Sequence, residues 1–435
     1  MPQVREVLPR QLRLTGLWLL VINGVIGAGI FGLPAALAAT AGGLAPWLLL
    51  AGGVLILPVI LVFADLSSRF NATGGPVLYT STAFGPFTGF QVGWAFYVAR
   101  LTAFAANANL LVTTLGWFNP DLAEGHGRAI ALSVLILALI LINLVSTRAA
   151  VRSLGVLTAA KLLPLAALAL AGLWLLPAAA HHLPSAQGTP NALAVGPALV
   201  LVIYAYVGFE SGLVPAGEAT SPGRDLPRAL FLALGMAGML YALVQVACTA
   251  LVPDLAHSQR PVVQAGEALA GALGAGVIVA AVVASVGGNL LGAMYSTPRI
   301  TYRLALDGYL PTVLAHVHPR HGVPHASIVL FGGVALALAV SGSFALLAVM
   351  SVLVRLGIYM LSALALPRLR HVHGDPVSGS HRMLIVFTLL FCAGLATQVD
   401  ATSWLATGLL LGAGSLLYGV SRARAGSSSG TPPGG

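Results

Sequence analysis

Charged side chains are scarce in this sequence. Aspartate, glutamate, lysine and arginine make up 8% of its 435 residues, whereas a soluble globular domain carries about 25%. Long runs such as Ala131–Leu144 and Val277–Leu291 contain no charge at all. This shortage excludes a protein with an ordinary solvated surface and predicts that most of the chain lies in lipid.

Cysteine is also rare, and its two copies, Cys248 and Cys392, both fall inside apolar segments. No metal-ligand spacing is present, so we expect neither a disulfide nor a metal or other cofactor. The glycines at Gly27-Ala28-Gly29 do not form a nucleotide loop, because no strand precedes them and no lysine follows at the required spacing. The net charge of +9 comes from residues between apolar segments, so we expect no nucleic-acid partner.

The apolar runs are long enough to cross a bilayer as helices. A hydrocarbon core about 30 Å thick needs roughly 20 mostly apolar residues, and only helices or closed barrels satisfy their backbone groups in lipid. The runs do not alternate, which excludes a barrel. Twelve candidate spans follow, at residues 15–39, 45–66, 86–115, 129–147, 154–176, 196–217, 229–252, 271–297, 325–341, 344–366, 383–398 and 401–420.

The connections between these spans are short, so residues 15–424 are predicted to form one all-α integral membrane domain. Residues 1–14 would be a cytoplasmic N-terminus, and the first apolar run a retained span instead of a cleaved signal. The Ser/Gly/Pro-rich residues 425–435 are expected to be a disordered tail.

Arginines predict the orientation, because cytoplasmic loops carry an excess of basic residues. With the N-terminus inside, only Arg128 and Arg260 would lie on the outer side. The cytoplasmic side would hold sixteen arginines: Arg5, Arg10, Arg13, Arg69, Arg148, Arg152, Arg224, Arg228, Arg299, Arg303, Arg320, Arg368, Arg370, Arg382, Arg422 and Arg424. We therefore expect a multi-pass protein of the cell membrane with both termini in the cytoplasm.

Two spans, five helices apart, carry helix-weakening residues near their middle. The first contains Ile26–Pro34, with three glycines and a proline, and the sixth contains Tyr204–Gly212, with Pro215 shortly after. Such paired interruptions point to a transporter with inverted repeats and a substrate site at the bilayer midplane. The alternative is that the glycines only permit close helix packing.

The motifs around these interruptions resemble those of the amino acid–polyamine–organocation superfamily. The resemblance covers about residues 15–370. It rests on Gly27-Ala28-Gly29-Ile30, Ala64-Asp65-Leu66-Ser67, Gly74-Gly75-Pro76, Tyr79, Phe84-Gly85, Gly93-Trp94, Gly208-Phe209-Glu210, Gly217-Glu218, Pro222, Pro227-Arg228-Ala229, Asp307-Gly308-Tyr309-Leu310-Pro311 and Pro324. It implies a five-plus-five inverted repeat with interrupted first and sixth helices, followed by two C-terminal helices, about twelve in all.

The interruptions also predict how an amino acid would be held. Unwinding at Ile26, Gly27, Ala28, Gly29 and Ile30 would present N–H groups at a half-helix N-terminus, which suits a carboxylate. Glycine is needed where a side chain would block that approach.

Unwinding of the sixth span would leave carbonyls for an ammonium group. The residues concerned are Tyr204, Ala205, Tyr206, Val207 and Gly208. The resemblance further implies that Tyr204 covers the substrate and that Phe96 of the third span is a pocket aromatic. Ordinary packing is the alternative for both rings.

Lys161 is the only lysine in the chain and falls inside the fifth span. An ionisable residue at membrane depth is a functional candidate by default. The resemblance implies that a lysine here takes the place of a bound sodium ion, so we expect Lys161 to couple transport to protons. The alternative is that its ammonium reaches an interface.

Four other charges fall in or near the spans. Glu210 could orient a gate, bind a cationic group or cap freed N–H groups, and Asp65 is expected to anchor a loop. Arg100 shares a helix face with Phe96, and we predict that it pairs with Glu210, directly or through water. It could instead meet an acidic substrate side chain or a helix-end carbonyl. Arg355 has no clear role in the sequence.

We therefore expect a secondary active transporter of amino acids or related amines, proton-coupled and sodium-independent, that works by alternating access. Its partners would be that small-molecule substrate, protons and membrane lipid. An exporter or an amino acid/polyamine exchanger of the same fold is the alternative. A membrane-embedded enzyme is disfavoured because no cluster of catalytic residues appears, and a channel because the interruptions are of substrate size.

Overall fold

A computed structural model describes residues 12–70, 75–145, 154–179, 192–213, 219–318, 322–372 and 374–428. Several residues on which the sequence-based expectations rest lie outside these ranges: Arg5, Arg10, Gly74, Arg148, Arg152, Pro215, Gly217, Glu218, Arg320 and residues 429–435.

The described chain is helical, with one isolated β-bridge between Leu12 and Ala219. The α-helices are α1 (Leu14–Val25), α2 (Gly29–Ala41), α3 (Ala45–Leu55), α4 (Leu57–Ser68), α5 (Gly75–Phe84), α6 (Pro86–Leu115), α7 (Gly125–Val145), α8 (Leu154–Ala179), α9 (Ala192–Tyr206), α10 (Pro222–Leu251), α11 (Pro261–Val282), α12 (Gly288–Ser296), α13 (Pro298–Leu306), α14 (His325–Ser341), α15 (Phe344–Val372), α16 (Gly379–Ala396) and α17 (Ala401–Ser428).

Eight stretches of the described residues are helices long and apolar enough to cross a membrane. Four shorter apolar helices, at Leu14–Val25, Lys161–Leu175, Val195–Tyr206 and His325–Ser341, occupy the remaining predicted spans. The prediction of a multi-pass, all-helical integral membrane protein is confirmed at this level.

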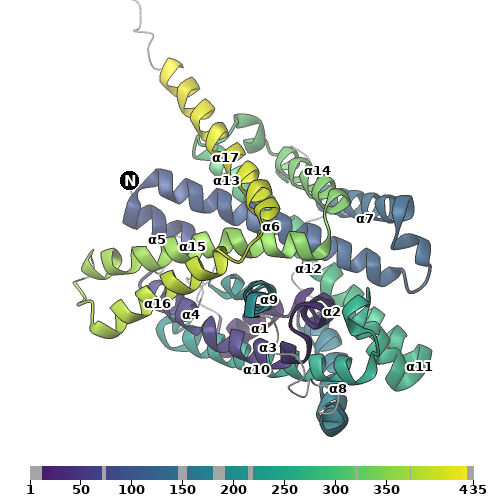
Figure 1. Cartoon of the computed structure of the whole chain (residues 1–435). Helices are drawn as coiled ribbons and strands as arrows, with labels where there is room; N and C mark the ends of the chain where they lie inside the picture. The colour runs from purple at the N-terminus through teal and green to yellow at the C-terminus, as the bar shows by residue number, and fades with distance from the viewer. Residues whose placement is uncertain are drawn as a thin grey trace, which may run out of the picture.

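Two sets of helix contacts determine where the broken spans lie. The long helices α6 and α15 pack along each other, and α1, α2 and α9 lie beside them at the centre of the molecule (Figure 1). Helix α10 packs against α1, α3 and α8 on the other side of α1. The two interrupted spans, α1–α2 and α9, are therefore enclosed by α6, α10 and α15.

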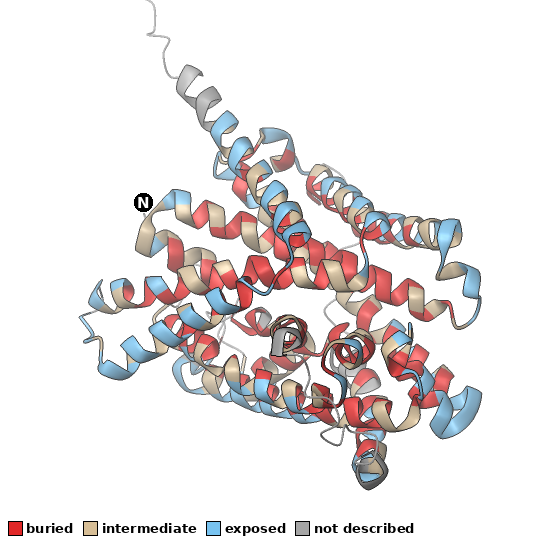
Figure 2. Ribbon diagram, viewed as in Figure 1, coloured by how far each residue is buried: buried red, intermediate tan, exposed pale blue. Residues whose placement is uncertain are grey.

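Burial follows the same arrangement. The central helices are largely buried, and exposed residues gather on the peripheral ones (Figure 2). Many exposed side chains are large and apolar, such as Trp174 at 85% and Leu416 at 73% of full exposure. Apolar surface this extensive is unfavourable in water and suits contact with lipid.

Two helix boundaries carry information about the predicted spans. Helix α11 is interrupted at Ala270 (φ −142°) and Gly271 (φ 58°), so a new helix begins where the sequence placed the start of its eighth span. Helix α17 continues to Ser428, beyond Ala425, where the disordered tail was expected to begin.

Candidate functional site

The first span is broken between α1 and α2. Helix α1 ends at Val25, Ile26 is non-helical (φ −78°, ψ 80°), and α2 starts at Gly29. The first N–H groups of α2 have no partner within their own helix. A Cβ placed on Gly27 would meet no atom within 4 Å, so the backbone here borders open space, as the unwound first span predicted.

Lys161 of α8 holds the end of α1. It is 1% exposed, and its ammonium donates to the carbonyl oxygens of Ile26 at 2.8 Å and Asn23 at 3.2 Å, and to Asn23 Oδ1. These contacts face the protein interior, so the alternative in which the ammonium reaches an interface is wrong. A proton-coupling role for Lys161 stays a prediction.

The sixth span is broken after α9. The chain turns at Gly208, whose φ of +108° favours glycine, and resumes as a short 3₁₀ helix at Phe209–Gly212. A Cβ on Gly208 would lie 2.2 Å from the carbonyl oxygen of Gly24 in α1. Glycine is therefore required both by the backbone angle and by the close approach of the two broken helices.

Tyr241 of α10 joins the two breaks, a role that the sequence analysis missed. Its hydroxyl lies 2.8 Å from the carbonyl oxygen of Val25 and 3.0 Å from that of Ala205. The single hydroxyl proton is shared between these two acceptors or alternates between them, so the hydroxyl links the end of α1 to the end of α9. The only signal in the sequence was a polar ring in the middle of an apolar span.

A cavity of about 110 Å³ lies between the breaks. No carboxylate side chain is among its described lining residues. These are Gly24, Val25, Gly27, Ala28, Gly29, Arg100, Ala103, Phe104, Asn107, Tyr204, Val207, Gly208, Asn289, Ala293 and Arg355. A space this small suits a compact solute more than a drug-sized one, for which pockets of several hundred Å³ are usual.

Several predicted site residues line the cavity and others do not. Gly27, Ala28, Gly29, Tyr204, Val207 and Gly208 line it, whereas Ile26, Ile30, Ala205, Tyr206 and Phe96 are not among its lining residues. Ala205 and Ile26 still contribute to the two helix breaks, because their carbonyl oxygens accept hydrogen bonds from Tyr241 and Lys161, respectively.

Tyr206 points away from the cavity. Its hydroxyl donates to the carbonyl oxygen of Leu49 at 2.5 Å and lies beside Gly53 and Gly238, so its ring packs between α3 and α10. The third-span aromatic that borders the cavity is Phe104 and not Phe96, which lies about two helical turns earlier on α6.

Asn107 and Asn289 add polar groups that the sequence analysis did not single out. The Asn107 amide nitrogen donates to Asn289 Oδ1 at 3.0 Å, and the Tyr204 hydroxyl donates to Asn107 Oδ1 at 3.3 Å. The chain of bonds links α9, α6 and α12 across the cavity wall. Asparagines inside apolar spans were the available signal, since polar residues at membrane depth are usually functional.

Glu210 is held by α15. Its Oε1 accepts from the Tyr359 hydroxyl and lies 3.4 Å from Arg355 Nε, and its Oε2 accepts from the Gly208 N–H at 2.7 Å. The last contact matches the interpretation in which Glu210 caps a freed N–H group. Arg355 also donates to the carbonyl oxygens of Ala99 and Ser351.

The predicted direct ion pair between Arg100 and Glu210 is wrong. Among the described residues the cationic partner of Glu210 is Arg355. Arg100 donates instead to Thr297 Oγ1 and Ser296 Oγ, each at 3.3 Å, and its guanidinium lies 5.7 Å from the centre of the Phe96 ring. The sequence assigned Arg355 no role, and only the packing of α15 against the end of α9 places its guanidinium beside Glu210.

Asp65 lies in a charged cluster at the far end of α4. Its carboxylate is 2.7 Å from Arg69, 2.6 Å from Arg370 of α15 and 3.4 Å from His381 of α16. Arg69 in turn contacts Asp375 in the loop between α15 and α16. The cluster fixes that loop against α4, which agrees with an anchoring role for Asp65.

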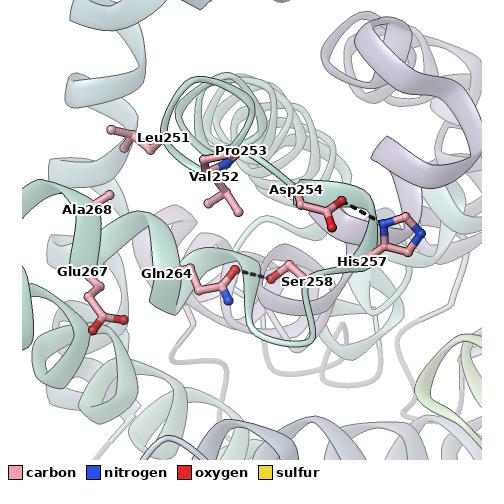
Figure 3. Close-up of a pocket in the computed structure, with 9 residues that line it drawn as sticks. All are labelled: Leu251, Val252, Pro253, Asp254, His257, Ser258, Gln264, Glu267 and Ala268. Atoms are coloured by element: carbon pink, nitrogen blue, oxygen red, sulfur yellow. Dashed lines mark hydrogen bonds and ion pairs between the residues drawn. The ribbon is translucent and has the colours of Figure 1, made fainter.

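A larger and more open pocket lies at the connection between α10 and α11 (Figure 3). Its polar side chains bond one another: His257 Nδ1 lies 2.8 Å from Asp254 Oδ1, and the Ser258 hydroxyl donates to Gln264 Oε1 at 2.6 Å. The His257 and Asp254 side chains are about four-fifths exposed, at 84% and 75%. Exposed groups that already satisfy each other make a poor ligand site, so the smaller buried cavity is the candidate.

Comparison with known proteins finds similarity to transporters. A family model described as amino acid permease matches residues 12–417. An uncharacterized transporter of Mycobacterium bovis is 30% identical over 443 residues, covering 96% of this chain and 93% of that protein. An uncharacterized transporter of Mycobacterium tuberculosis is 28% identical over 433 residues, covering 92% and 89%.

A serine/threonine exchanger of Bacillus subtilis, SteT, is 28% identical over 328 residues. The match covers 71% of this chain and 72% of the exchanger.

Proposed function

The chain belongs to the amino acid permease family, and we propose on this basis that it is a secondary active transporter of amino acids or related amines, driven by protons without sodium. This membership confirms the resemblance that the motifs indicated, and the family is one of transporters and not of enzymes. The direction of transport, the driving ion and the identity of the substrate are part of the proposal and not of the family assignment.

One observation carries the proposal: two broken helices meet around a buried cavity. The N–H groups at the start of α2 would receive the carboxylate of an amino acid, and the carbonyl groups at the end of α9 would receive its ammonium. Gly27 and Gly208 line the cavity, so the substrate could approach the backbone closely at both breaks. We infer alternating access about this midplane site in a five-plus-five inverted repeat of twelve spans, with both termini in the cytoplasm.

Lys161 supports the choice of proton over sodium. Its ammonium lies between Ile26 and Asn23 and donates hydrogen bonds to their carbonyl oxygens and to the side-chain oxygen of Asn23. These hard oxygen atoms are also what a bound sodium ion would need. A lysine ammonium in the place of that sodium ion can release and regain a proton, whereas a bound sodium ion must itself enter and leave the site.

The test is transport into proteoliposomes that contain the full chain. We expect counterflow, in which internal unlabelled amino acid accelerates entry of labelled amino acid, and accumulation under an inward proton gradient without sodium. Liposomes without protein are the control. Entry that internal substrate does not accelerate would indicate a channel, and strict sodium dependence would contradict the proton coupling.

Exchange is the second candidate, and the similarity to a serine/threonine exchanger favours it. The same proteoliposomes distinguish the two functions. A proton-driven carrier accumulates substrate in empty vesicles, whereas an obligatory exchanger takes up label only when the vesicles are preloaded.

A further inference from the structure

The cavity carries more positive than negative charge. Arg100 and Arg355 both line it, and none of its described lining residues is acidic. Glu210 lies behind Arg355 and is 2% exposed. Among these three side chains, two guanidinium groups and one carboxylate, one positive charge is left without a counter-charge in the absence of substrate.

The two arginines differ in whether a carboxylate balances their positive charge. Arg355 is 4% exposed, pairs with Glu210 and donates to the carbonyl oxygens of Ala99 and Ser351. Arg100 forms no ion pair among the described residues, and its guanidinium donates hydrogen bonds to the hydroxyl groups of Thr297 and Ser296. Hydroxyl groups orient a guanidinium but do not neutralise it.

An uncompensated charge at membrane depth is energetically expensive. An anion that enters the cavity would remove that penalty, and a guanidinium presents N–H groups in a fork that matches a carboxylate. The α-carboxylate and the ammonium of an amino acid are already accommodated at the helix breaks in the proposed function. The charge of Arg100 therefore remains for a second carboxylate, on the substrate's side chain.

The rest of the wall suits the same group. Asn289 lines the cavity and accepts from Asn107 through its Oδ1, which leaves its amide N–H donors for a ligand oxygen. The Tyr204 hydroxyl proton is committed to Asn107. A cationic side chain would find no carboxylate among the described lining residues and would be repelled by Arg100.

We propose that the substrates are acidic α-amino acids and that Arg100 binds their side-chain carboxylate. This inference rests on the proposed transport of amino acids and narrows it, since amines and basic amino acids are excluded. The four-carbon and five-carbon members, aspartate and glutamate, are the compact solutes of this class.

The experiment compares each acid with its neutral amide, which has nearly the same shape. In proteoliposomes, unlabelled L-glutamate, L-aspartate, L-glutamine, L-asparagine and L-lysine compete with labelled L-glutamate or L-glutamine for entry. We expect each acid to compete at least about tenfold more strongly than its amide, and lysine to compete least. Equal competition by acids and amides, or stronger competition by the amides or lysine, would overturn the inference while leaving amino acid transport intact.

Two substitutions test whether the preference for acids over amides depends on Arg100. Arg100→Gln should collapse the ratio of acid to amide affinity toward one, and Arg303→Gln should leave the ratio unchanged, because the Arg303 side chain is 73% exposed and pairs with Asp307. If Arg100→Gln fails to fold, Arg100→Lys keeps the charge without the fork and should lower the ratio several-fold. A full acid preference in either folded Arg100 variant would overturn the role of Arg100. No entry of labelled L-glutamate would overturn the inference, whereas the absence of counterflow with every amino acid tried, serine and threonine included, would overturn the proposed function itself.

Discussion

The ammonium of Lys161 on α8 donates a hydrogen bond of 2.8 Å to the carbonyl oxygen of Ile26, the residue at which α1 stops being helical. A carbonyl in a broken helix lacks its usual N–H partner. The only lysine of the chain thus satisfies backbone that lies next to the cavity. A change in its protonation would alter that hydrogen bond and the position of the break together.

Lys161→Ala should abolish accumulation driven by a proton gradient and retain counterflow exchange. The substitution removes the group that we propose to take up and release the proton, and it keeps the break that we propose to hold the substrate. It also leaves the Ile26 and Asn23 carbonyls without their donor, at a cost of about 1–3 kcal/mol each for a buried group. Comparison of proton-driven uptake with counterflow in the same proteoliposomes separates loss of coupling from loss of fold. Normal proton-driven uptake by this variant would contradict the assignment.

Gly27→Leu should abolish transport in a protein that inserts and folds. A Cβ at Gly27 meets nothing within 4 Å, so the leucine side chain would start in open space and fill part of the cavity that Gly27 lines. The measurement is uptake normalised to folded protein by size-exclusion chromatography. Gly235→Leu is the matched control, because Gly235 of α10 is exposed and its added Cβ also meets no atom. Wild-type uptake by a well-folded Gly27→Leu protein would remove this break from the site.

Gly208→Ala should destabilise the protein by about 2 kcal/mol or more. A left-handed backbone costs a residue with a Cβ about 1–2 kcal/mol, and that atom would also lie 2.2 Å from the Gly24 carbonyl oxygen. Gly276→Ala is the control, since its Cβ has open space within a regular helix. Thermal denaturation of the two variants in the same detergent gives the comparison. Equal stability would mean that the two broken helices can separate at no cost.

Glu210 and Arg355 should be energetically coupled, and Glu210 and Arg100 should be coupled less. Loss of one member of a buried ion pair costs about 3–5 kcal/mol because it strands the other charge. Glu210→Gln and Arg355→Gln should therefore each be damaging, and their combination should cost less than their sum by about 1 kcal/mol or more. The same cycle with Arg100→Gln is the comparison. A larger coupling to Arg100 would contradict the observed pairing.

The sequence by itself determined the spans and the places where two of them break. Span length depends on the thickness of the bilayer, and the apolar runs predicted every long helix, including the restart of α11 at Gly271. Both interruptions coincide with glycine, whose flexibility is a local property. The burial of Lys161 also followed from its position within an apolar run.

Only the tertiary structure decided which side chains meet. The sequence paired Arg100 with Glu210 and gave Arg355 no role, because the contact between Glu210 and Arg355 depends on how α15 packs against the end of α9. Phe96 also needed the structure, because it shares a helix face with Arg100 but lies too far along α6 to be among the residues that line the cavity. Tyr241 could not be predicted either, since its hydroxyl bridges Val25 and Ala205 only after α10 packs across both broken helices. Local periodicity is encoded residue by residue, whereas helix rotation is set by the summed packing of all neighbouring helices.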